Sequence, residues 1–225
     1  MDARPLSFTY WSDPLCIWAF VAQPRLDAVL GWYEDRVAVE YRIVPIFGSL
    51  PWRFREGSWA KGGVEARVAA TQRVARQFGR EDVTGEVWRD DTPASSWAPS
   101  LAIKAVFGMA ADGQITERLA AAYQWRLRER FFVDDVNIAR RAAQLAVAEE
   151  LELPIAAIER RLDDGTALAA LWEDHHARTE QKIAGSPTWV FDGGRAKLYG
   201  NFDEGVLQAT VDQLVNGLDS GGTQC

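Results

Sequence analysis

The chain has 225 residues, of which 32 are acidic and 25 are basic, so its formal net charge at pH 7 is −7. A composition that is 48% hydrophobic and 25% charged is typical of a globular protein and excludes extensive disorder. The negative balance and the lack of a long Lys/Arg stripe disfavour nucleic-acid binding. No apolar stretch approaches the ~20 residues that a membrane-spanning helix needs, so we expect no membrane association.

The N-terminal sequence lacks the basic and apolar segments of a secretory signal peptide, so we expect a cytoplasmic protein. Only two cysteines, Cys16 and Cys225, are present, which excludes a small secreted domain held together by disulfides. Cys225 ends a Gly/Ser-rich tail, residues 219–225, that is predicted to be flexible. Cys16 is therefore the candidate reactive thiol.

The first predicted elements are a strand and the helix that follows it. Residues 8–11 are β-branched and aromatic and predict a strand. Asp13 or Ser12 is the expected N-cap of a helix that has Pro14 in its first turn and runs to about Trp32.

Further along this helix, Pro24 is expected to produce a kink. Apolar and polar residues alternate from 37 to 44, which predicts a second, half-buried strand. A β-α-β unit of this kind pairs its two strands in parallel through a right-handed crossover.

From about residue 61 to 182 the hydrophobic period is that of helices, and no strand is expected there. The strand pattern returns at residues 188–191 and 196–199, which the turn at 192–195 joins into a hairpin. An amphipathic helix at 203–214 closes the chain. The helices predicted in the central block cover residues 63–78, 97–107, 115–127, 134–153, 155–162 and 167–183. Its Arg-rich stretch, residues 126–130, is expected to be a solvated helix end.

Cys16 has a physical reason to be reactive, because it lies near the start of a helix that follows a strand. Helix N–H groups and the helix dipole stabilise a thiolate there and lower its pKa from ~8.5 to roughly 3.5–7.5. The alternative is an inert, buried cysteine. A second candidate element is Ser186-Pro187 before the third strand, where a cis bond would expose the N–H and C=O of Ser186 to a ligand. A trans proline that starts the strand is the alternative.

Three segments together resemble a known superfamily. They are residues 12–20 (SDPLCIWAF), 23–26 (QPRL) and 185–191 (GSPTWVF). The first is similar to the active-site segment of FrnE-like proteins, in which Asp-Pro leads into Cys-Pro-Trp-Cys, and the last is similar to their cis-proline loop. The chain thus resembles the thioredoxin-like superfamily, in the DsbA branch that also holds the kappa-class glutathione transferases and the 2-hydroxychromene-2-carboxylate isomerases.

The resemblance extends from about residue 6 to 215 and implies an α/β, thioredoxin-like fold with a large all-helical insertion. Its β-α-β and β-β-α parts give the expected domains: residues 1–60 and 183–218 form the thioredoxin-like domain, and residues 61–182 form the insertion domain.

The chain departs from the family at the second cysteine of the Cys-x-x-Cys motif. Cys16 aligns with the attacking cysteine, but Ala19 occupies the resolving position. Dithiol exchange needs a second local thiol to release the mixed disulfide. The resemblance therefore implies monothiol chemistry at Cys16, with glutathione or another small thiol as co-substrate and with no metal and no tightly bound cofactor.

The resemblance also implies the residues that contact the thiol or the substrate. Asp203 is expected to pair with a ligand ammonium group, and the helix after it with the ligand's carboxylate; a plain N-cap is the alternative for Asp203. Aromatic residues of the loop 47–59 belong to the core or wall a pocket over Cys16. The full set of expected binding residues is Asp13, Pro14, Trp18, Ser186, Pro187, Thr188, Asn201 and Asp203.

The leading functional hypothesis is a cytoplasmic thiol-disulfide oxidoreductase of the DsbA family, in which Cys16 forms a transient mixed disulfide. Its expected partners are a small thiol and a substrate disulfide, and a homodimer is among its expected states. One alternative is a glutathione-dependent isomerase or transferase that acts on an aromatic compound. The other is a catalytically inactive module that binds a peptide or protein partner through the Pro187 loop.

Overall fold

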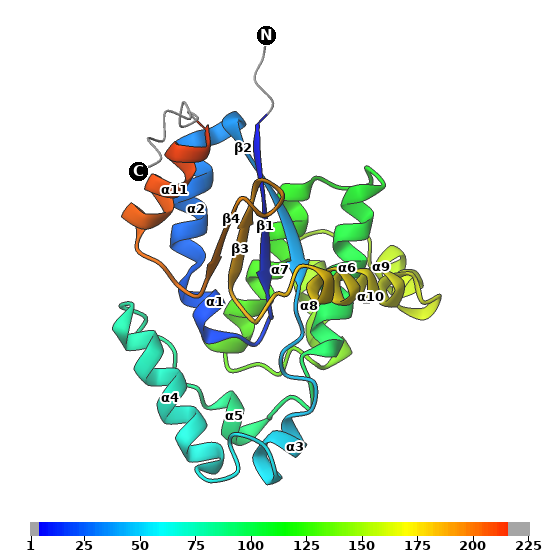
Figure 1. Ribbon diagram of the computed structural model, residues 1–225. Coiled ribbons are helices and arrows are strands. Elements are labelled where there is room, and N and C mark those ends of the chain that lie inside the picture. The colour runs from blue at the N-terminus through cyan, green and yellow to red at the C-terminus, as the bar shows by residue number, and fades with distance from the viewer. Residues whose placement is uncertain (1–4, 216–225) are drawn as a thin grey trace.

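The computed structural model describes residues 5–215, and the predicted tail 219–225 lies outside this range (Figure 1). The elements follow the predicted order of strands and helices. They are β1 (Leu6–Ser12), α1 (Ile17–Val21), α2 (Gln23–Tyr33), η1 (Glu34–Arg36), β2 (Val37–Ile43), α3 (Leu50–Arg55), α4 (Gly63–Gln77), α5 (Val87–Asp90), α6 (Trp97–Ala111), α7 (Glu117–Phe132), α8 (Arg141–Glu150), α9 (Ile155–Asp163), α10 (Thr166–Glu180), β3 (Thr188–Phe191), η2 (Asp192–Gly194), β4 (Ala196–Tyr199) and α11 (Glu204–Val215).

The four strands form one sheet in the order β2-β1-β3-β4. β1 pairs with β2 in parallel, with Phe8 opposite Val39, as the β-α-β prediction requires. β3 lies antiparallel to β1 and to β4, so the predicted hairpin is also confirmed. The predicted kink near Pro24 is a break between α1 and α2 at Ala22.

Helices cover both faces of this sheet. α2 and α11 lie side by side against one face (Figure 1), where their apolar residues pack on those of β1 and β3. On the other face, Trp11 and Val190 pack with Ile183 and with Ala177 of α10. The first cluster contains Leu6, Phe8, Tyr10, Leu26, Val29, Trp189, Phe191, Leu207 and Val211. These two cores fix the end of β1 that leads into Cys16.

The insertion is helical, as predicted, and within residues 5–215 no strand lies between β2 and β3. One predicted helix, 134–153, is wrong at its start, because α7 ends at Phe132 and α8 begins only at Arg141. Asp135 adopts a positive φ of 52°, which a helix does not allow, and its Oδ1 accepts the N–H of Val87 over 3.0 Å. The sequence analysis also missed α3, which Ser49 caps by accepting the N–H of Trp52.

The insertion packs directly on α1. α3, α4 and α5 lie beyond the end of the sheet at which α1 begins (Figure 1), and one continuous core joins α1 to α4 and α7. Cys16 and Phe20 belong to this core together with Val68 and Phe131. The insertion therefore covers the candidate thiol. The domain boundaries at residues 60 and 183 remain a prediction.

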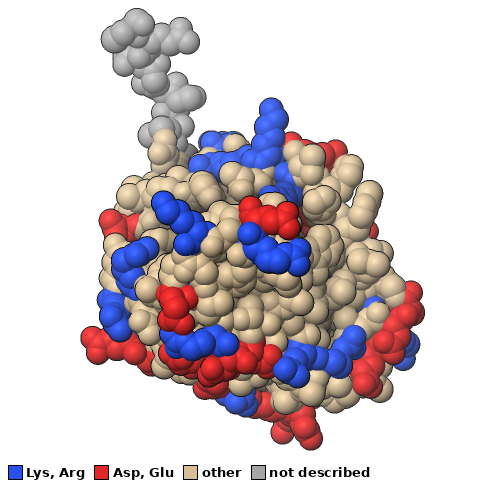
Figure 2. Space-filling model, turned by 90° about the horizontal axis from the view of Figure 1, so that it is seen from below, with Lys and Arg blue, Asp and Glu red and all other residues tan. Residues whose placement is uncertain are grey.

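Two surface properties bear on the excluded functions. On the face that α3, α4 and α5 present, basic and acidic side chains are interspersed around an uncharged centre (Figure 2). None of the described helices is long and apolar enough to cross a membrane.

Candidate functional site

Cys16 stands directly before α1 as its N-cap residue, with an extended backbone (φ −85°, ψ 111°). The turn that leads to it is shaped by Asp13, whose Oδ1 accepts the N–H of Leu15 over 2.7 Å. The sequence predicts that the helix starts at residues 12–14, and this is wrong, because the helix begins only at Ile17. Cys16 therefore precedes the helix instead of lying inside its first turn.

The carboxylate of Asp13 holds three loops together. Its Oδ2 accepts the N–H of Ile46 and the hydroxyl of Ser96, each over 2.7 Å, besides the bond from Leu15 to Oδ1. Burial raises the pKa of Asp13 to about 6, although these hydrogen bonds act in the opposite direction. Because protein donors already engage the carboxylate, Asp13 positions the loops around Cys16.

The proline loop lies against the thiol. The Ser186–Pro187 bond is cis, as predicted. The Sγ of Cys16 donates to the backbone carbonyl of Ser186 over 3.3 Å, and the N–H of Asp13 donates to the Ser186 hydroxyl over 2.9 Å. The N–H of Ser186 has no hydrogen-bond acceptor among residues 5–215. Two segments far apart in the sequence thus form one site.

The residues around Pro187 fix this loop to the sheet. The hydroxyl of Thr188 donates to the carbonyl of Gly185 over 2.8 Å, and both residues are buried. A Cβ at Gly185 would lie 2.9 Å from the Tyr199 hydroxyl, so the close approach of β4 requires glycine there. Thr188 therefore supports the loop from within.

Burial controls the protonation of Cys16. The side chain is only 3% exposed, and burial raises the pKa of the thiol. The contact with Ser186 and the N–H groups of Ala19 and Trp18 lower the pKa, but by less, while the charge of Asp13 raises it. The expectation of a lowered pKa is therefore wrong in sign: the start of the helix does act on the sulfur, but the loss of water outweighs it.

The resolving position contains no thiol. Ala19 is completely buried, and its N–H donates to the carbonyl of Cys16 over 3.1 Å, so the two residues share one turn. Cys16 is the one cysteine within residues 5–215, and Cys225 lies outside them.

Arg128 is a site residue that the sequence analysis missed. The Arg-rich stretch 126–130 is predicted to be solvated, but Arg128 is only 1% exposed. Its Nη2 donates to the hydroxyl of Ser12 over 2.6 Å, while its Nε has no hydrogen-bond partner in the described part of the chain. The signal was the i, i+4 placement of Gln124 and Arg128 beside buried Leu127, which puts both on the inner face of α7.

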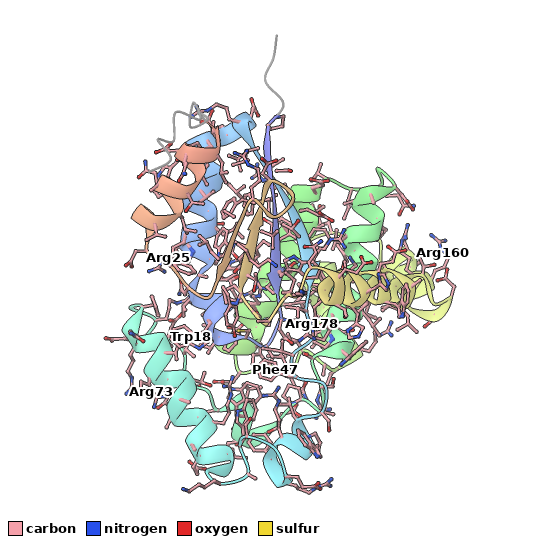
Figure 3. All side chains as sticks on the ribbon, in the orientation of Figure 1. Trp18, Arg25, Phe47, Arg73, Arg160 and Arg178 are labelled. Atoms are coloured by element: carbon pink, nitrogen blue, oxygen red, sulfur yellow. The ribbon has the colours of Figure 1, made fainter. Side chains whose placement is uncertain are left out.

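Two other predicted residues lie at the start of α1. Pro14 is buried in the turn between β1 and Cys16. Trp18 is 41% exposed and packs edge-to-face against Phe78, with ring centroids 6.1 Å apart. Figure 3 shows Trp18 between α1 and the end of α4. Trp18 is therefore a partly exposed apolar surface at the rim of the site.

The segment after β4 also approaches the proline loop. The N–H of Gly200 donates to the carbonyl of Pro187 over 2.9 Å. In the next residue, Asn201, both polar side-chain atoms are buried and have no hydrogen-bond partner among the residues described. Asp203 is exposed directly before α11, and its backbone carbonyl accepts the N–H of Val206.

A model of the DSBA-like thioredoxin domain matches residues 8–212. This chain belongs to that family. A curated relative, the ClpXP adapter protein SpxH of Halalkalibacterium halodurans, is 27% identical over 194 residues, which are 84% of this chain and 59% of the relative. The chain therefore spans less than two thirds of that relative's length.

Two solved structures are similar in fold. The cytosolic disulfide reductase DsbM of Pseudomonas aeruginosa, solved with GSH, has a TM-score of 0.65 at 21% identity and covers 94% of this chain and 96% of its own. A 2-hydroxychromene-2-carboxylate isomerase has a TM-score of 0.67 at 19% identity, with 92% and 95% covered. These likenesses establish the thioredoxin-like fold with a helical insertion.

Proposed function

We propose that the protein is a monothiol thiol-disulfide oxidoreductase that uses Cys16, with glutathione or another small thiol as its co-substrate. The observation that carries this proposal is the 3.3 Å contact between the Sγ of Cys16 and the carbonyl of Ser186 in the cis-proline loop. With Ala19 at the resolving position, release of the product depends on an external thiol.

The proposed reaction has two exchange steps. The Cys16 thiolate attacks the disulfide of a glutathionylated substrate, so a Cys16–glutathione disulfide forms and the substrate leaves as a thiol. A second glutathione thiolate then attacks this mixed disulfide, releases oxidised glutathione and restores Cys16. The substrate gains the two electrons that two glutathione thiols lose.

Several contacts support a small-thiol ligand. The free N–H of Ser186 is a donor for a ligand carbonyl, and the unpartnered amide of Asn201 offers both a donor and an acceptor beside Pro187. Trp18 supplies apolar surface, and Asp203 supplies a negative charge for a ligand ammonium group. The neighbour DsbM is described as cytosolic and was solved with GSH. We place the activity in the cytoplasm, where the thiol pool is reduced, and a homodimer stays a prediction.

A glutathione-dependent isomerase or transferase acting on an aromatic compound is the second candidate. The raised pKa of Cys16 favours a protonated thiol that holds a ligand over a thiolate that attacks one. The unpartnered Asn201 supports a bound ligand in either case. The fold is also that of a 2-hydroxychromene-2-carboxylate isomerase.

A partner-binding module without catalysis is the third candidate. Its support is the curated relative, which is described as an adapter protein. The same burial of Cys16 that slows thiol exchange is compatible with this role.

The test is turnover of a glutathione mixed disulfide by the wild type, Cys16→Ser and Cys225→Ser, coupled to glutathione reductase. We expect turnover and one glutathionyl adduct on Cys16 in the wild type and in Cys225→Ser, and neither in Cys16→Ser. Saturable glutathione binding without any adduct would favour the isomerase. The absence of both binding and an adduct would favour the partner-binding module.

A further inference from the structure

A small cavity of about 120 Å³ lies at the N-terminus of α4. Trp59 and the first turns of the helix, from Gly62 to Ala70, line it together with Arg67. Gly62 is the N-cap and provides no side-chain acceptor for the helix N–H groups. The positive end of a 15-residue helix therefore faces this cavity.

Arg67 is an unusual wall for such a cavity. Its guanidinium carbon lies 4.4 Å and 4.5 Å from the ring centroids of Trp59 and Trp88. Its Nε and Nη2 are buried, yet no residue from 5 to 215 accepts a hydrogen bond from them or forms an ion pair with the side chain. Burial lowers the pKa of Arg67 to about 10, so the side chain remains charged at neutral pH. Aromatic faces compensate only part of the cost of a buried cation.

A second guanidinium packs on the same rings. The Cζ of Arg53 lies 5.0 Å from the centroid of Phe47 and 5.2 Å from that of Trp59, and its Nη2 donates to the carbonyl of Ile46 over 2.5 Å. The positive charge of Arg53 also acts on Arg67, in the same direction as burial. Two cations and a helix N-terminus thus meet around Trp59, and no carboxylate of the described chain forms an ion pair with either cation.

The cavity belongs to the neighbourhood of Cys16. The negative charges that act on Arg67 are those of Cys16 and Asp13, and three protein donors already engage Asp13. Phe47, which lies 5.7 Å from the guanidinium of Arg67, belongs to the same core as Cys16. Figure 3 shows Phe47 between the end of the sheet and the α3–α5 layer.

We propose that this cavity binds the carboxylate of a small organic acid, which is the substrate or thiol used at Cys16. A planar carboxylate matches the guanidinium fork, and tryptophan and alanine walls accept an apolar body. The volume is close to that of a ~150 Å³ cavity that holds benzene. The assignment of this ligand to Cys16 rests on the proposed function, whereas the binding of the carboxylate does not.

The binding test uses benzoate and its neutral isostere benzamide, measured by isothermal titration calorimetry. We expect the wild type to bind benzoate at least tenfold more tightly than benzamide, and Arg67→Gln to lose this preference. Arg73→Gln is the matched control, because Arg73 is exposed on the outer side of the same helix (Figure 3) and its loss removes an equal charge. Equal binding of both probes by the wild type, or an equal loss in Arg73→Gln, would overturn the proposal.

Two further variants keep the test decisive. Arg67→Lys retains the charge and should retain a preference for benzoate even if Arg67→Gln does not fold. Cys16→Ser should bind benzoate as the wild type does, so failure of the thiol activity and failure of this site give different results.

The link to Cys16 is tested by alkylation with iodoacetate and with neutral iodoacetamide. In both reactions the Cys16 sulfur forms a bond to carbon and iodide leaves. Arg67→Gln should lower the iodoacetate-to-iodoacetamide rate ratio at least threefold, and Arg73→Gln should leave it unchanged. An unchanged ratio in folded Arg67→Gln would show that the cavity does not serve Cys16.

Discussion

The Nη2 of Arg128 donates a hydrogen bond of 2.6 Å to the hydroxyl of Ser12, in the strand that leads to Cys16. Gln124 also donates to this hydroxyl, over 3.3 Å. Arg128 forms no ion pair with the residues described, and the charge of a Cys16 thiolate acts on it. A buried positive charge therefore lies behind the thiol on the side of α7.

We expect Arg128→Met to raise the pKa of Cys16 further, because it removes a positive charge that favours the thiolate. The pH dependence of iodoacetamide alkylation at Cys16 should move to higher pH. Arg126→Met is the control, since Arg126 lies on the same helix and pairs with Glu150 over 2.7 Å near the surface. A shift to lower pH in Arg128→Met would contradict the electrostatic role of Arg128.

Asp13 should make the stability of the protein depend on pH. Burial raises its pKa from 3.8 to about 6, so the folded state holds this proton more tightly than the unfolded state. The contribution is greatest below pH 4 and is lost as the pH rises to 6, by about 3 kcal/mol. Urea unfolding from pH 4 to 7 measures it, and Asp13→Asn, which cannot titrate, should remove this decline. A decline of equal size in Asp13→Asn would assign it to other groups.

Ser186→Ala should destabilise the site without removing the backbone carbonyl that faces Cys16. The substitution leaves the buried N–H of Asp13 without its 2.9 Å acceptor, which costs about 1–3 kcal/mol in the free energy of unfolding. Ser58→Ala, at an exposed position, should change it by less than ~0.5 kcal/mol. Equal effects in urea unfolding would show that the Asp13–Ser186 bond does not stabilise the fold.

Ala19→Cys should restore dithiol chemistry, because residues 16 and 19 share one turn. Ala19 is completely buried, so the added sulfur costs about 1–3 kcal/mol and leaves the protein folded. We expect a 16–19 disulfide under oxidised glutathione and faster reduction of insulin with dithiothreitol than in the wild type.

Ala22→Cys is the control for this change, since Ala22 is equally buried but lies at the break between α1 and α2. If folded Ala19→Cys forms no disulfide, the isomerase and partner-binding hypotheses move ahead of redox exchange.

Local sequence patterns predicted the architecture well. The alternation in β2 and the turn at 192–195 gave the strands and the hairpin, because period and turn chemistry are local properties. The pairing of Cys16 with Ser186 followed from the resemblance of two motifs, and the 3.3 Å contact confirms it.

The electrostatics of the site were not predictable in the same way. The pKa of Cys16 depends on burial beneath the insertion, and no residue near Cys16 in the sequence records that burial. The start of α1 moved because Ile46 and Ser96 engage the carboxylate that the sequence assigns to the N-cap. The burial of Arg128 depends on which face of α7 turns inward. These properties arise from tertiary packing.

The bond between Asp13 and Ser186 joins residues that are 173 positions apart. During synthesis, which proceeds from the N-terminus, Cys16 leaves the ribosome long before the loop against which it rests. The nascent chain therefore carries a thiol without its final hydrogen-bond acceptor until Ser186 has also emerged. The completed site is a late product of folding, and any fragment that ends before β3 lacks it.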